Sequence, residues 1–218
     1  MPKSLLITRP DDDPLLNALF HWCKPIILEA QKKQFSIYDL SGNKAIKTKF
    51  DSYVSRNNPK LIFFNGHGSK DSIHGYNKEV LIDSTDCIQL LRGTIVYVRS
   101  CNVGASMGQI STKSGGGAVA FIGYSAKFWL ILSKSRNTLP LLDPVAKFFL
   151  ETSNLVPLSL IKGNSVEEAD KKSRDAMLRS YLFMNSSKAT TEQRQAAGFL
   201  YLNRLFQVVH GDKTARLY

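Results

Sequence analysis

The stretches LIFFNGHG at residues 61–68 and TIVYVRSCNVG at residues 94–104 decide the fold of this chain. Each begins as a short, nearly continuous apolar run, which is typical of a strand buried on both faces of a parallel sheet. The first run leads into His67 and the second into Cys101. If the two strands are parallel neighbours, both residues emerge at the carboxyl edge of the sheet, where open α/β sheets bind ligands. The pattern therefore predicts an imidazole and a thiol in one site.

Four more runs of this kind indicate a sheet of about six strands. The expected strands are residues 4–8, 35–39, 61–64, 94–98, 118–124 and 206–210. Helical or polar segments separate them, which favours a mostly parallel central sheet with helices on both faces. We therefore expect an α/β fold in which residues 1–218 form a single domain.

The segments between these strands carry sequence patterns that are typical of helices. The expected helices are residues 14–31, 48–56, 166 to about 183, and a weaker one after Thr190. Pro25 should kink or split the first, because proline has no N–H to donate within a helix. Ser165 and Glu168 form a capping box that marks a helix start.

Three connecting segments also have recognisable patterns. Residues 74–82 contain glycine and asparagine next to an apolar run, which predicts a small hairpin at the edge of the sheet. Residues 111–117 form a glycine-rich loop. Residues 125–137 show no firm period, and long irregular segments of this kind are more often functional than structural.

The composition limits the class of protein. With 218 residues, 43% hydrophobic and 22% charged, the chain can bury a substantial globular core. No run reaches the roughly 18 apolar residues of a membrane helix, and the acidic run at residues 11–13 argues against a signal peptide. Three cysteines without C-x-x-C spacing indicate neither a disulfide framework nor a zinc site. We expect a reducing, cytoplasmic compartment and no membrane association.

The net charge of +11 at pH 7 is spread along the chain. No Lys/Arg block and no stacking pattern of aromatic residues accompanies it. We interpret it as a solvated basic surface that can steer an acidic partner but has no specific nucleic-acid binding of its own.

The dipeptide His-Gly occurs three times, so its context must select among the copies. Only His67 follows a strong central strand, and the glycines on both sides of it permit a sharp turn. His74 is expected in an exposed loop, and His210 ends the last strand.

Among the three cysteines, Cys101 is the candidate nucleophile. It stands at the end of its strand, and the small residues after it could open a helix whose N-terminus would acidify the thiol. Cys87 lacks such a setting and Cys23 lies in the apolar first helix, so both are expected in the core.

These residues resemble the caspase-hemoglobinase class (clan CD) of cysteine peptidases, in which one apolar strand ends in His-Gly and a later one in Ala-Cys or Ser-Cys. The matching elements are His67-Gly68 and Ser100-Cys101. Gingipain-like and CHAT-type (separase-related) members are most similar, and the likeness covers most of the chain. It extends through residues 81–90, 117–123, 163–169 and 211–212. The caspase pentapeptide Gln-Ala-Cys-x-Gly is absent, since RSCNV stands at residues 99–103.

The resemblance implies a three-layer caspase-like fold and a cysteine endopeptidase that cleaves a protein substrate. His67 would act as base and then acid, Cys101 would attack the scissile carbonyl, and the N–H groups of Gly68 and Cys101 would hold the oxyanion. The sequence identifies no carboxylate for His67, and the class usually operates with a dyad. No metal or cofactor is implied. Control by a regulatory protein partner or by assembly is expected, and the alternative is a catalytically silent caspase-like module for binding or scaffolding.

The resemblance implies that the specificity pocket draws on two regions, the loop at residues 9–13 after the first strand and residues 125–143 beyond the cysteine. An acidic side chain from either loop, Asp11, Asp13 or Asp143, could select a basic residue before the cleaved bond. Phe128 and Trp129 could equally build an apolar pocket. The acidic run at residues 11–13 has a structural interpretation too, as the N-cap of the helix that begins at Pro14.

Overall fold

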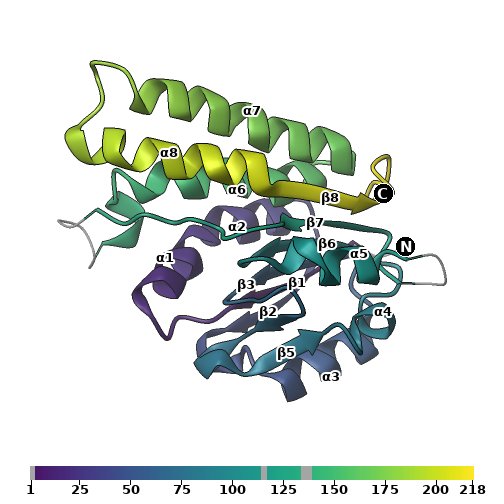
Figure 1. Ribbon diagram of the computed structural model, residues 1–218. Helices are drawn as coiled ribbons and strands as arrows, with labels where there is room; N and C mark the ends of the chain where they lie inside the picture. Colours follow the sequence, from purple (N-terminus) through teal and green to yellow (C-terminus); the bar gives the residue numbers. More distant parts are fainter. Residues whose placement is uncertain (1–2, 114–116, 134–138) are drawn as a thin grey trace.

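A six-stranded sheet forms the centre of the molecule (Figure 1). The computed structural model describes residues 3–113, 117–133 and 139–218. The strand order is β2-β1-β3-β6-β7-β8, and only β8 runs antiparallel to its neighbour. The strands are β1 Ser4–Arg9, β2 Ser36–Ser41, β3 Leu61–Asn65, β6 Ile95–Arg99, β7 Ala120–Tyr124 and β8 Gln207–Gly211. All six predicted strands are confirmed within about two residues.

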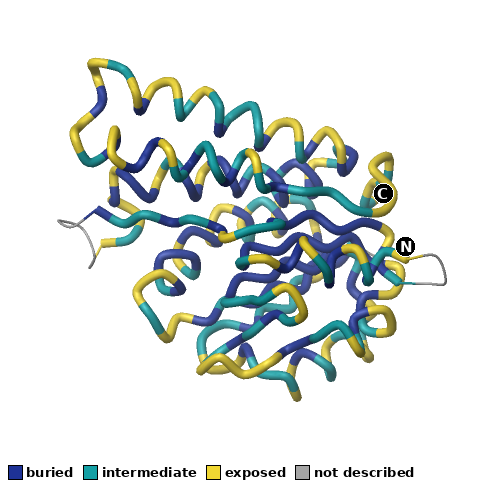
Figure 2. The backbone as a smooth tube through the Cα atoms, viewed as in Figure 1, coloured by how far each residue is buried: buried dark blue, intermediate teal, exposed yellow. Residues whose placement is uncertain are grey.

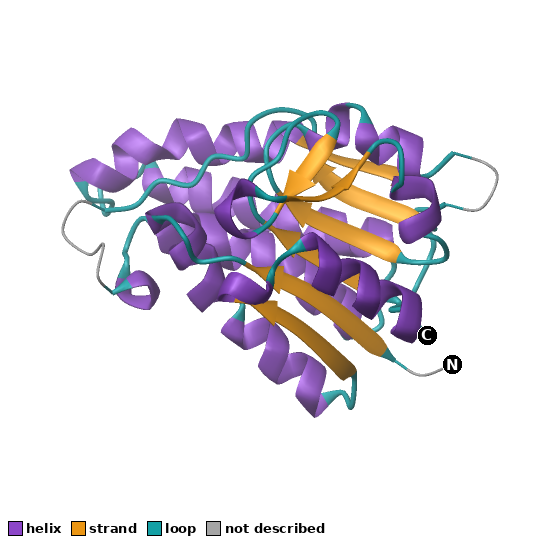
Figure 3. Ribbon diagram, turned by 90° about the horizontal axis from the view of Figure 1, so that it is seen from below, coloured by secondary structure: helices purple, strands orange, loops and turns teal. Residues whose placement is uncertain are grey.

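Two hydrophobic cores lie on opposite faces of the sheet, which gives the three layers of a caspase-like fold (Figure 3). One core joins the sheet to α1 Pro14–Trp22, α2 Lys24–Lys32, α6 Ala146–Ile161, α7 Val166–Met184 and α8 Thr191–Phe206. The other joins it to α3 Lys47–Asn57, α4 Cys87–Leu90 and α5 Met107–Ser111. Every residue of β3, β6 and β7 is buried (Figure 2), as their continuous apolar runs predict.

Local signals fix several helix ends. The first helix splits as expected: α1 ends at Trp22, and Pro25 occupies the first turn of α2, where its missing N–H costs nothing. The Ser165/Glu168 capping box is present at the start of α7, and a second one caps α8. Four 3-10 turns complete the described elements: η1 Gly42–Lys44, η2 Tyr76–Lys78, η3 Val103–Ala105 and η4 Pro140–Leu142.

The small hairpin differs from its prediction in position. Strands β4 Ser72–His74 and β5 Val80–Asp83 pair with each other as a separate two-stranded sheet. Ile73, Leu81 and Ile82 pack into the core beside α3 and α4, so the hairpin covers a face of the main sheet instead of extending its edge. His74 is accordingly a half-buried strand residue and not an exposed loop histidine. Of the predicted 111–117 loop, residues 114–116 lie outside the described part of the chain.

Helix α6 was not predicted, because it is apolar on most sides and carries Pro157. Proline removes the N–H that would bond to the carbonyl four residues earlier, at Ser153. The hydroxyl of Tyr97 in β6 donates to that carbonyl at 3.0 Å. The central sheet therefore satisfies the acceptor that the proline leaves free.

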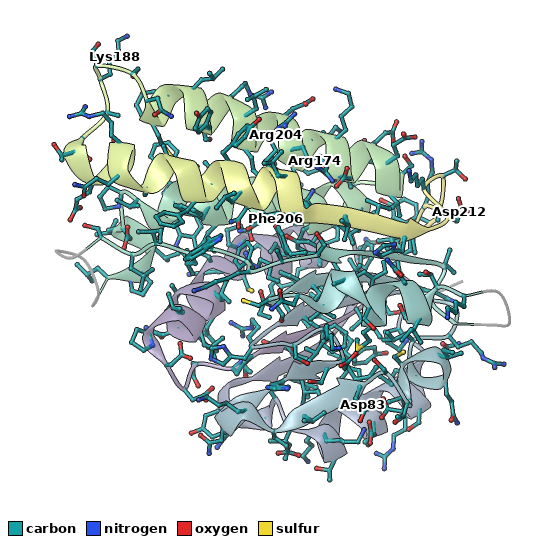
Figure 4. All side chains as sticks on the ribbon, viewed as in Figure 1. Asp83, Arg174, Lys188, Arg204, Phe206 and Asp212 are labelled. Carbon is teal, nitrogen blue, oxygen red and sulfur yellow. The ribbon has the colours of Figure 1, made fainter. Side chains whose placement is uncertain are left out.

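The antiparallel strand β8 follows α8 directly, without a loop. Arg174 of α7 lies against this junction (Figure 4), where its guanidinium donates to the carbonyls of Arg204 and Gln207. These bonds hold the chain where its direction changes from helix to strand.

Candidate active site

Three neighbouring strands deliver three chemically capable residues to one edge of the sheet. β1, β3 and β6 are adjacent and parallel, so their carboxyl ends lie side by side. Asp13 follows β1, His67 follows β3 and Cys101 follows β6. The topology thus brings together residues that are 54 and 34 positions apart.

His67 and Cys101 line the same cavity of about 290 Å³, as the sequence predicted for two strand-terminal residues. The cavity is also lined by Leu15, Leu16, Leu19, Gly66, Arg99, Ser100, Lys127, Phe128 and Leu130. Cys101 is half-buried, and its sulfur lies 3.9 Å from the carbonyl oxygen of Phe128. Cys23 and Cys87 are buried in the core, which confirms their predicted placement.

His67 has a carboxylate partner that the sequence did not reveal. Its Nε2 lies 2.6 Å from Oδ2 of Asp13, and both side chains are about one-third exposed. Because a carboxylate only accepts, Nε2 carries the donated proton, and Nδ1 stays available to exchange a proton with another group. The sequence alone did not identify this carboxylate; the structure places Asp13 beside His67.

The same Asp13 caps a helix. Its Oδ1 accepts the N–H of Leu16 at 2.8 Å, so one carboxylate fixes both the start of α1 and the imidazole. The N-cap interpretation of the acidic run is confirmed for Asp13. An N-cap side chain is held rigidly by the helix backbone, so its second oxygen has a defined position.

Close backbone packing holds the histidine loop. A Cβ on Gly66 would stand 2.1 Å from the carbonyl oxygen of His74, and the N–H of His74 donates to the carbonyl of His67 at 2.9 Å. Burial and the neighbouring charge of His67 lower the pKa of His74, which keeps that second imidazole neutral near pH 7. Strand β4 therefore supports the loop without adding a competing charge.

Gly68 packs against the cysteine loop. A Cβ there would meet Val103 Cγ2 at 2.7 Å and Ser100 Cβ at 2.8 Å, while Ser100 Oγ donates to the carbonyl of Gly66 at 2.8 Å. Neither the N–H of Gly68 nor that of Cys101 donates to another described residue. Both remain available to an external acceptor.

Cys101 does not stand at the start of a helix, as the small residues after it led us to expect. Asn102 adopts a left-handed conformation (φ 64°), the three-residue turn η3 follows it, and α5 begins only at Met107. The N–H of Asn102 donates instead to the carbonyl of Ala126 at 2.9 Å, which ties this turn to the segment after β7.

The residues proposed for specificity are dispersed. Phe128 lines the cavity, whereas Trp129 packs on Phe199 of α8, 4.6 Å between ring centroids. Asp11 lines a separate surface hollow beside Gly42. The buried carboxylate of Asp143 accepts N–H groups from Ser133, Val145 and Ala146, and so holds the start of α6. Within the described residues 125–133 the irregular segment has neither helix nor strand, as predicted.

Sequence reasoning missed most of the cavity wall. The leucines of α1 reach it because Asp13 starts the helix next to His67. Arg99 could have been noticed from the sequence, because it is the one charged residue in an otherwise apolar strand. In the described ranges, no group of three His, Cys, Asp or Glu side chains is arranged to hold a metal ion. No described helix has the length and hydropathy to cross a membrane.

Comparisons with known proteins support the fold alone. No protein-family model matches the chain, and no curated protein is similar to it in sequence. Among solved structures it is similar to the Arg-specific cysteine proteinase gingipain R (RgpB), with a TM-score of 0.64 and 12% identity over 98% of this chain. A complex of the pro- and mature domains of RgpB from Porphyromonas gingivalis gives a TM-score of 0.57 at 12% identity over 97%. The chain spans 47% of the length of either neighbour.

Proposed function

We propose that this protein is a cysteine endopeptidase in which Cys101 is the nucleophile, His67 the general base and acid, and Asp13 a positioning residue. One observation carries the proposal: the thiol and the imidazole line one cavity at the carboxyl edge of adjacent parallel strands. The Asp13 contact adds the third group that orients a base in thiol and hydroxyl nucleophile systems.

The chemistry follows from these groups. Nδ1 of His67 takes the thiol proton of Cys101 as sulfur bonds to the scissile carbonyl carbon, and the carbonyl π electrons move to oxygen. The N–H groups of Gly68 and Cys101 stabilise that oxyanion. Collapse breaks the C–N bond, His67 protonates the leaving amine, and a thioester remains. Water then attacks the thioester carbonyl carbon and gives a proton to His67. The C–S bond breaks to release the carboxylic acid, and His67 returns its proton to the sulfur, which restores the thiol and the neutral imidazole.

We further place the chain with gingipain-like and CHAT-type peptidases, as a single domain that acts on protein substrates in the cytoplasm. We propose that a partner protein or assembly controls it. The complex of pro- and mature domains formed by one structural neighbour is in keeping with control by an associated domain.

Selective labelling of Cys101 tests the proposal. A peptidyl acyloxymethyl ketone should alkylate Cys101 by losing its carboxylate, and peptide mass mapping should find one adduct per chain. Cys23 and Cys87 are internal controls, because burial raises the pKa of both thiols, that of Cys87 to about 11. Equal or absent labelling of all three cysteines would favour a silent binding module.

Asp13→Asn should lower kcat about tenfold to a hundredfold with little change in KM. Asparagine still caps α1, but an amide no longer supplies the negative charge that stabilises the imidazolium during proton transfer. The measurement is steady-state hydrolysis of a fluorogenic peptide.

Asp12→Asn is the matched control, since it removes the same charge one residue away, and within the described residues the Asp12 side chain accepts one hydrogen bond, from the N–H of Asn77 at 3.0 Å. The control should stay within about twofold of the wild type. If Asp13→Asn and Asp12→Asn hydrolyse the peptide with equal kcat, Asp13 has no role in catalysis.

A further inference from the structure

A buried arginine stands at the catalytic cavity. Arg99, the last residue of β6, has no measurable solvent exposure and lines the cavity with His67 and Cys101. It stands two residues before Cys101, at the point where β6 ends. Charged side chains are rarely buried completely without an ion partner.

All protein partners of Arg99 are neutral. Nε donates to Asn65 Oδ1 at 2.7 Å, Nη1 to Asn154 Oδ1 at 2.7 Å and Ser153 Oγ at 3.3 Å, and Nη2 to Cys23 Sγ at 3.2 Å. A guanidinium has five N–H donors. One N–H of Nη2 is therefore left without an acceptor among the described residues.

Neighbouring titratable groups do not supply a counter-charge. Burial raises the pKa of the Cys23 thiol above its ordinary value, so the sulfur is not a thiolate near pH 7. Burial likewise raises the pKa of Tyr97 to about 12 and that of Tyr124 well above its ordinary value. None of these three groups carries a negative charge near pH 7 that could neutralise Arg99.

The nearby carboxylates are already paired. Asp39 forms a two-point ion pair with Arg9, and Asp170 pairs with Arg174 at 2.8 Å (Figure 4 labels Arg174). Within the described residues no carboxylate forms an ion pair with Arg99. The guanidinium also lies over the Phe63 ring, 4.8 Å from its centroid, which is a further neutral partner and not a counter-ion.

Among the described residues, no carboxylate lines the cavity; the Asp13 carboxylate lies 2.6 Å from Nε2 of the lining residue His67. The walls are leucines of α1 together with Phe128 and Leu130, and the other lining cation among the described residues is Lys127, whose ammonium lies 4.0 Å from the centroid of the Trp129 ring. Apolar walls keep the local dielectric low, so charges act strongly across the cavity. A lysine or arginine side chain would meet the Arg99 guanidinium, while the Asp13 carboxylate is already bonded to His67 and to the N–H of Leu16. An acidic side chain would supply the counter-charge that Arg99 lacks.

We propose that this cavity receives the side chain that precedes the scissile bond and selects aspartate or glutamate there, with Arg99 as the specificity residue. The proposal rests on the proposed peptidase function and extends it to a substrate class. It assigns a preference opposite to that of the Arg-specific proteinase that shares the fold.

A peptide panel tests the preference directly. Fluorogenic peptides that differ only in the residue before the cleaved bond (Asp, Glu, Asn, Leu or Arg) are hydrolysed by the wild type. We expect kcat/KM for Asp or Glu to exceed that for Asn and Leu at least tenfold and to be lowest for Arg. A preference for Leu, or for Arg, would overturn the acidic assignment while leaving the peptidase proposal intact.

The variant Arg99→Gln identifies the residue responsible. It should abolish the preference for Asp over Asn, with folding verified by circular dichroism. Lys24→Gln is the matched control: Lys24 is an exposed cation at the start of α2 and does not line the cavity, so the preference should persist. If Arg99→Gln also keeps the preference for Asp over Asn, Arg99 does not determine the specificity.

A second measurement on the wild type covers the case in which Arg99→Gln does not fold. Peptide aldehydes ending in Asp, Leu or Arg should compete for labelling of Cys101 in that order of strength. If no peptide is cleaved and no electrophile labels Cys101 selectively, the peptidase proposal itself fails, and this inference with it.

Discussion

Replacing Cys101 by Ala is expected to lower peptide hydrolysis by more than about 10³-fold, and His67→Ala should do the same. Without the thiol no acyl intermediate forms, and without the imidazole neither thiol activation nor protonation of the leaving amine has a group to carry it out. Both residues are only half-buried beside a cavity, so the fold should remain. Activity of purified variants and their circular dichroism spectra are the measurements.

Two further variants separate loss of chemistry from general damage. Cys87→Ala removes a thiol from the opposite core, and His21→Ala removes an exposed imidazole from α1. Each should retain activity within about threefold, because neither residue lines the cavity. Full activity in Cys101→Ala or in His67→Ala would refute the proposed dyad.

Gly68→Ala should reduce kcat by about 10²-fold or more. The added methyl group would stand 2.7 Å from Val103 Cγ2 and 2.8 Å from Ser100 Cβ, which flank Cys101 in sequence. One of the two loops must then move, and the N–H groups of Gly68 and Cys101 can no longer converge on one oxyanion. Overpacking should also cost about 1–3 kcal/mol of folding free energy.

Gly198→Ala is the matched control for the glycine substitution. Gly198 lies in α8, and a Cβ there would meet nothing within 4 Å. Activity should be unchanged and the free energy of unfolding should rise by up to about 1 kcal/mol, because alanine favours helix more than glycine. If Gly68→Ala behaves like this control in steady-state kinetics and thermal unfolding, the proposed oxyanion site is wrong.

Helix α6 and Asp13 show where sequence reasoning reaches its limit. α6 has little amphipathic pattern and an internal proline, and its stability depends on Tyr97, which lies 56 residues from Ser153. Asp13 was correctly predicted as a helix cap, but its second oxygen meets His67 only because β1 and β3 are neighbours in the sheet. Both contacts join residues far apart in the chain, and no local pattern encodes them.

Local patterns alone determined the strands, the split at Pro25, both capping boxes and the placement of a strand-terminal histidine and a strand-terminal cysteine at one cavity. These features depend on interactions within a few residues of the chain: the period of apolar residues, the missing N–H of proline, and the side-chain hydrogen bonds of a capping box. Only the tertiary structure decided which carboxylate faces His67, which residues wall the cavity, and that Arg99 is buried without a counter-ion. The order of the strands sets those properties. It determines which distant segments meet at the carboxyl edge of the sheet and which charged side chains become buried.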